Sequence, residues 1–134
     1  MFFTFLNLFL VLFIILTNNK NIHLLSTILG LTFGVGITGS VILNMYYTDF
    51  SKKYKVTGKL LVLMDIITHI LPMIYMYNRT KGMDIKNIHL HILTSYLLAY
   101  IYSRIFNYNV VYPGVPEYVF YIVYPLAVIV PYII

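Results

Sequence analysis

Five apolar runs, separated by short polar segments, leave this chain few ways to fold. They cover about residues 2–17, 24–47, 60–77, 88–106 and 119–134. A helix needs roughly 17–25 residues to cross a bilayer, so the first and last runs are slightly short. In hydrocarbon every backbone polar group must find a partner within the protein, which a helix provides within its own segment. The sequence therefore predicts an all-α transmembrane helix bundle of about five spans, forming one domain over residues 1–134.

The composition agrees with a membrane location. Hydrophobic residues make up 60% of the 134 residues, and charged residues make up only 10%, whereas a soluble domain carries roughly 25% charged residues. We therefore expect a multi-pass integral membrane protein, with no indication of which membrane holds it. The chain contains no cysteine, which excludes disulfide bonds, thiol nucleophiles and cysteine metal sites.

The net charge of +5 does not indicate a nucleic-acid partner. The basic residues gather in two segments that flank apolar runs: Lys52, Lys53, Lys55 and Lys59 in the first, and Arg79, Lys81 and Lys86 in the second. Charges at the ends of membrane helices contact lipid headgroups and anchor the helix. We expect membrane lipids as partners and no nucleic acid.

The second run contains a series of small residues, Gly30, Gly34, Gly36 and Ser40. Small residues spaced four apart let two membrane helices approach closely. We expect this stripe to pack inside the bundle; homodimerisation is the alternative use.

Two ionisable residues, Asp65 and His69, lie inside the third run. They are four residues apart, so their side chains meet on one face of a helix. Counted from Lys59, they lie about 9 Å and 15 Å into the membrane. Such groups usually face the bundle interior and often mark function. The alternatives are a structural hydrogen bond that fixes the helix register, or a pairing of Asp65 with Arg104.

The remaining polar residues give weaker indications. His89 and His91 are two apart and point to different faces, which makes them a poor metal pair. We expect no metal and no cofactor. Thr4 lies in the first run. A threonine acts as a nucleophile only with a base within hydrogen-bond reach, and helix threonines usually bond a carbonyl of the preceding turn.

Several short motifs, in chain order, resemble the androgen-induced-protein family of polytopic membrane threonine hydrolases and their bacterial relatives. They are "FFTFLNL" around Thr4, "YYTDF" at Tyr46–Phe50, "HILP" at His69–Pro72, and "SYLLAYIYSRIF" followed by "VVYPGVPEY". The resemblance covers nearly the whole chain, without the family's first span. It implies hydrolysis of fatty acid esters, with Thr4 at the nucleophile position and His69 as the histidine.

The chain departs from that family pattern in two ways that concern the site. The family histidine is expected five residues before the proline, whereas His69 is three before Pro72, and two residues rotate a helix position by about 200°. Thr4 should also lie near the membrane interface. If both helices stand upright, it would lie about 10 Å from the depth of His69.

Two functions remain open from the sequence. The first is an intramembrane lipid-ester hydrolase, in which Thr4 is the catalytic nucleophile, His69 the base and Asp65 the residue that orients the base. The second is a non-catalytic membrane module, such as a viral structural membrane protein or a partner subunit. The distance between Thr4 and His69 separates them: the hydrolase requires these side chains to meet beside a pocket.

Overall fold

The computed structural model describes residues 3–105 and 114–134, with the side chains of residues 47–50 left out. Within these ranges the chain is helical and contains no strand, which confirms the predicted all-α class. The elements are α1 (Phe3–Thr17), α2 (Ile22–Met45), α3 (Tyr47–Tyr54), α4 (Gly58–Asp65), the π-helix η1 (Ile66–Ile70), α5 (Leu71–Thr80), α6 (Ile88–Ile105) and α8 (Glu117–Ile133).

Each apolar run forms a helix, and the third run forms one continuous rod from α4 through η1 to α5. Two of these helices, Ile22–Met45 and Gly58–Thr80, are long and apolar enough to cross a membrane by length and composition. The polar segment between the second and third apolar runs, which we expected to be a loop, is partly helical, because α3 occupies Tyr47–Tyr54. No glycine or proline interrupts this polar stretch before Gly58, so it can form a helix from local hydrogen bonds alone.

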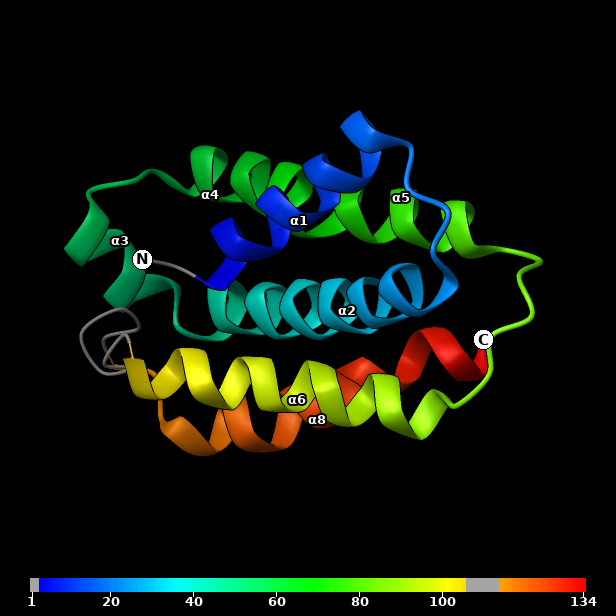
Figure 1. The fold of residues 1–134 in the computed structure, drawn as a ribbon. Coiled ribbons are helices and arrows are strands. Elements are labelled where there is room, and N and C mark those ends of the chain that lie inside the picture. The colour runs from blue at the N-terminus through cyan, green and yellow to red at the C-terminus, as the bar shows by residue number, and fades with distance from the viewer. Residues whose placement is uncertain (1–2, 106–113) are drawn as a thin grey trace.

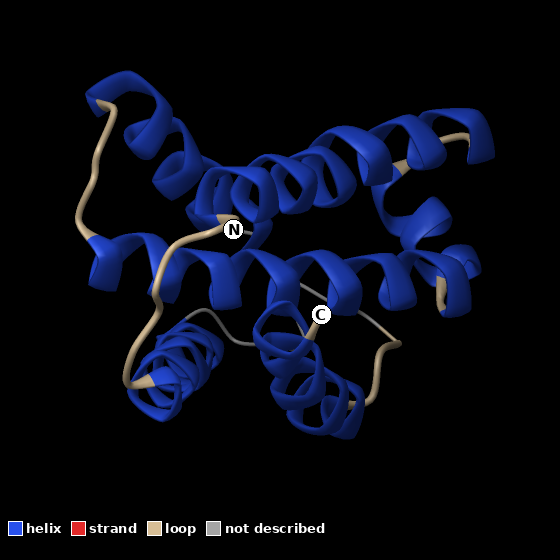
Figure 2. Ribbon diagram, turned by 90° about the vertical axis from the view of Figure 1, so that its right-hand side faces the viewer, coloured by secondary structure: helices blue, strands red, loops and turns tan. Residues whose placement is uncertain are grey.

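α2 is the centre of the bundle. The rod of α4, η1 and α5 lies with α1 on one side of α2, and the pair α6 and α8 lies on the other side (Figures 1 and 2). The two hydrophobic core clusters both include α2 residues, such as Leu31 and Val35 in one and Leu25 and Phe33 in the other. Because α2 packs against helices on both of its sides, its residues can form a site together with residues of either side.

The small residues of α2 pack within the bundle, as predicted, but on two faces rather than one. Gly34 lies against Tyr124 and Val128 of α8, whereas Gly36 lies against Met73 of α5. Gly36 comes two residues after Gly34, which turns it about 200° around the helix axis. The prediction of a single stripe was therefore wrong, and the two faces hold α2 to both layers.

Side-chain hydrogen bonds join α6 to α8, and join α2 to its neighbours on both sides. The Tyr124 hydroxyl donates to the Ser95 carbonyl at 3.0 Å, and the Tyr132 hydroxyl donates to the Ser26 carbonyl at 2.6 Å. On the other side, the Thr32 hydroxyl donates to the Asn7 side-chain oxygen at 2.9 Å. These bonds satisfy polar groups inside the protein, where a polar group without a partner would be destabilising.

Candidate active site

The π-helix η1 carries His69, and Pro72 follows its last residue, Ile70, by two positions. Pro72 lacks the N–H group that would bond the Thr68 carbonyl, and its ring crowds that carbonyl in a regular α-helix. Here the Leu71 N–H bonds the Ile66 carbonyl, five residues back. The wide π-turn accommodates the proline without ending the helix, and such single π-turns occur often at functional sites.

Asp65 and His69 meet as the sequence predicts. His69 Nδ1 lies 2.8 Å from Asp65 Oδ1, and the histidine is only 5% exposed. The Ser40 hydroxyl donates to the same carboxylate oxygen at 2.6 Å. An ionised carboxylate only accepts hydrogen bonds, so this network assigns the proton of the neutral imidazole to Nδ1 and leaves Nε2 as an acceptor.

The hydroxyl of Thr4 lies 3.1 Å from this Nε2 atom. The expected depth difference of about 10 Å between Thr4 and His69 is therefore wrong, because it assumed upright helices. α1 instead crosses α2 obliquely, and its first described turn contacts η1 (Figure 1). The alternative pairing of Asp65 with Arg104 does not form among the described residues: Asp65 contacts His69 and Ser40, and the Arg104 guanidinium donates to the Tyr100 hydroxyl at 3.3 Å.

Gly39 of α2 lies directly against the His69 ring. A Cβ atom at this position would collide with Nε2, Cε1 and Cδ2 of His69, so only glycine lets the ring lie against the α2 backbone. Sequence reasoning missed this role of Gly39 and assigned Ser40 to helix packing. The signal was the adjacent pair Gly39-Ser40. Gly39 lets the His69 ring approach the α2 backbone, and the Ser40 hydroxyl donates to Asp65.

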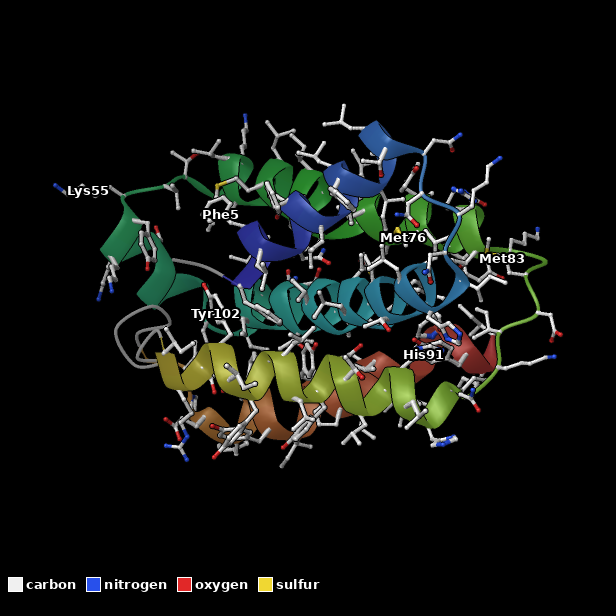
Figure 3. The ribbon with its side chains drawn as sticks, viewed as in Figure 1. Phe5, Lys55, Met76, Met83, His91 and Tyr102 are labelled. Carbon is white, nitrogen blue, oxygen red and sulfur yellow. The ribbon has the colours of Figure 1, made fainter. Side chains whose placement is uncertain are left out.

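A cavity of about 150 Å³ opens beside Thr4 and His69. It lies toward the end of the bundle where Phe5 of α1 and Lys55 after α3 are found (Figure 3). Most of the side chains around it are apolar. The lining residues are Phe3, Thr4, Phe5, Val35, Thr38, Gly39, Ile42, Leu43, Tyr54, Val56, Leu61, Met64, Thr68, His69 and Phe120.

The other histidines form no comparable arrangement. His91 is buried near the opposite end of the bundle (Figure 3), where its Nδ1 accepts from the Thr27 hydroxyl at 3.1 Å and its Nε2 donates to the Lys86 carbonyl at 2.9 Å. His91 and Thr27 do not line the cavity described above. Across residues 3–105 and 114–134, no three His, Asp or Glu side chains gather as a metal site would require.

Comparisons of the chain with protein-family models, curated proteins and solved structures found no match. Thr4, His69 and Asp65 form a continuous relay in which a hydroxyl meets an imidazole and the imidazole meets a carboxylate. This is the order of nucleophile, base and orienting group in hydrolases that form a covalent acyl intermediate.

Proposed function

We propose that this protein is an intramembrane lipid-ester hydrolase with Thr4 as its nucleophile, His69 as its base and Asp65 as the group that orients the base. The observation that carries the proposal is the hydrogen-bonded relay from Thr4 to His69 to Asp65 at the edge of an apolar cavity. A relay that served packing alone would not need a cavity beside the hydroxyl. The proposal includes kinship with the androgen-induced-protein family, on the motifs given above.

In the proposed reaction, Thr4 Oγ attacks the ester carbonyl carbon while His69 Nε2 takes the hydroxyl proton. The tetrahedral intermediate collapses by breaking the ester C–O bond, and the departing alcohol takes the proton from Nε2, leaving an acyl ester on Thr4. Water then attacks this ester, giving its proton to His69, and the Thr4 oxygen leaves and recovers the proton. Asp65 stabilises the imidazolium that forms in each half-reaction.

The size and lining of the cavity favour an ester with long apolar chains. A cavity of about 150 Å³ is comparable to one that holds a single benzene molecule. It has room for the ester group and a few carbons. The rest of the substrate must lie outside the cavity, where the lipid chains of a bilayer would surround it.

We also propose that five helical segments cross the membrane, as the sequence predicted. These five rods are α1, α2, the continuous α4–η1–α5 segment, α6 and α8. Large apolar side chains cover the outer faces of the bundle, and soluble monomers rarely expose contiguous apolar surface on this scale. Each of the five rods contributes to this surface. Examples at least 50% exposed are Phe5, Phe9 and Leu16 of α1, Met45 of α2, Val62 and Leu71 of the α4–α5 rod, Leu93 and Ile105 of α6, and Leu126 and Ile133 of α8.

Five crossings predict that α3 and the C-terminus lie on opposite sides of the membrane, as they lie at opposite ends of the bundle (Figure 1). The chain has no cysteine, so a single cysteine at Lys53 or at Ile134 gives a clean label. In sealed vesicles of one orientation, an impermeant thiol reagent should modify Lys53→Cys from one side and Ile134→Cys from the other. Labelling of both from the same side would contradict the five-span proposal.

The hydrolase proposal is tested by assaying the purified protein against a panel of long-chain lipid esters. We expect turnover by the natural chain and a loss of about a hundredfold in Asp65→Asn. An amide still accepts from His69 Nδ1 but cannot stabilise the imidazolium. Asp84→Asn is the matched control, because Asp84 is highly exposed and pairs with the exposed Lys86. Absence of turnover on every ester would favour the non-catalytic membrane module instead.

A further inference from the structure

The hydroxyl of Thr38 is the feature that the proposed mechanism leaves unused. Thr38 lies on α2 and is only 2% exposed. Its Oγ1 atom has no hydrogen-bond partner within the part of the chain that the structure describes. A buried polar group without a partner destabilises a protein, so each one calls for a physical explanation.

Other threonines in these helices behave differently. Helix threonines commonly return their hydroxyl to the carbonyl of the preceding turn. This bond forms to the carbonyl four residues earlier at Thr17, Thr32, Thr68, Thr80 and Thr94. Thr38 has the same local option, the carbonyl of Gly34, and does not use it.

The position of Thr38 connects it to the proposed reaction. It lines the same cavity as Thr4 and His69, and it precedes Gly39, whose backbone lies against the His69 ring. The hydroxyl of Thr68, a cavity-lining residue of η1, already donates to the Met64 carbonyl. Thr38 thus lies beside the cavity with a hydroxyl that is not committed to a helix carbonyl, and this hydroxyl is available as a donor to a polar atom of a ligand there.

We propose that the Thr38 hydroxyl donates a hydrogen bond to the carbonyl oxygen of the ester, and holds that oxygen as it becomes negatively charged. This inference rests on the proposed function. Attack by Thr4 on the ester carbon places the developing charge on this oxygen, and a preorganised donor in a water-poor site stabilises that charge strongly. The same cavity would then supply both the nucleophile and the oxyanion donor.

The kinetic test compares Thr38→Val, which keeps the shape and removes the hydroxyl, with Thr38→Ser, which keeps the hydroxyl. We expect Thr38→Val to lower kcat about 10²- to 10³-fold with a smaller change in KM, and Thr38→Ser to retain most activity. The melting temperature of Thr38→Val should not fall, because the hydroxyl it removes has no partner. Ser26→Ala is the matched control: Ser26 also carries a buried hydroxyl without a hydrogen-bond partner among the described residues, but it does not line the cavity.

A binding measurement separates this inference from the hydrolase proposal. The probe is 2-dodecanone with a ¹³C-labelled carbonyl, whose infrared stretching frequency falls when the oxygen accepts a hydrogen bond. We expect the lower frequency with the natural chain and with Thr4→Ala, and a return toward the apolar-solvent value with Thr38→Val. Thr38→Ala removes the same hydroxyl and serves if the valine variant does not fold.

The outcomes are distinct. A Thr38-dependent frequency shift without ester turnover would refute the hydrolase and keep Thr38 as a carbonyl-binding residue. Ester turnover with the same kcat and the same carbonyl frequency in the natural chain and Thr38→Val would overturn the inference and leave the hydrolase in place.

Discussion

Replacing Thr4 or His69 with alanine is expected to lower ester hydrolysis by at least about a thousandfold while the protein still inserts and stays monodisperse. Thr4→Ala removes the attacking oxygen, and His69→Ala removes the acceptor for its proton, so either change stops formation of the acyl intermediate. Thr4→Ser keeps a hydroxyl and should retain part of the activity. The measurement is kcat on a long-chain ester, with size-exclusion chromatography and helical circular dichroism to verify folding.

Two variants control for the loss of a threonine or a histidine elsewhere. Thr94→Ala removes an exposed helix hydroxyl that donates to the Leu90 carbonyl, and His89→Ala removes an exposed imidazole on α6. Both should keep full activity. A purely structural relay predicts another pattern, in which His69→Ala lowers the melting temperature and Thr4→Ala changes nothing. That pattern, with no esterase activity in the natural chain, would refute the hydrolase.

Gly39→Ala is expected to cost about a hundredfold in kcat, although it adds only one methyl group and touches none of the reacting atoms of the substrate. The new Cβ would collide with the His69 ring at the atom that faces Thr4. The ring must move, and a displacement of about 1 Å in a catalytic group can cost about a hundredfold in rate. The measurement is kcat, compared with the melting temperature of the same preparation.

Gly36→Ala is the matched control for this change. Its Cβ would also meet a side chain too closely, but the contact is with the flexible end of Met73, which can shift. We expect Gly36→Ala to keep most of its activity. Equal activity in Gly39→Ala and the natural chain would show that the position of the His69 ring does not matter for turnover.

The parts of this fold that depend on local sequence could be predicted. The apolar runs gave the main helices because each helix satisfies its own backbone groups. The contact between Asp65 and His69 followed from a separation of four residues on one helix. The helix α3 was missed because it is only eight residues long and mostly polar. Its aromatic residues Tyr47, Phe50 and Tyr54 recur at helical spacing, but so short a pattern between two apolar runs is hard to distinguish from a loop.

The contact between Thr4 and His69 could not be predicted because it depends on how the helices cross. Helix tilt is set by packing between layers, and no residue pattern within α1 specifies it. The π-turn at Ile66–Ile70 also changes the direction in which His69 points relative to Pro72. A helical wheel with regular spacing cannot represent this change. The contributions of Ser40 and Gly39 belong to the same non-local packing.

The covalent acyl intermediate tests the central claim most directly. The purified protein is mixed with a long-chain 4-nitrophenyl ester, release of 4-nitrophenolate is followed on the millisecond scale, and the acid-quenched protein is analysed by peptide mass spectrometry. The hydrolase predicts a burst of about one equivalent of 4-nitrophenolate and an acyl group on the Thr4 side chain, both absent in Thr4→Ala. A burst that persists in Thr4→Ala, or an acyl group found on another residue, would contradict the assignment of Thr4 as the nucleophile.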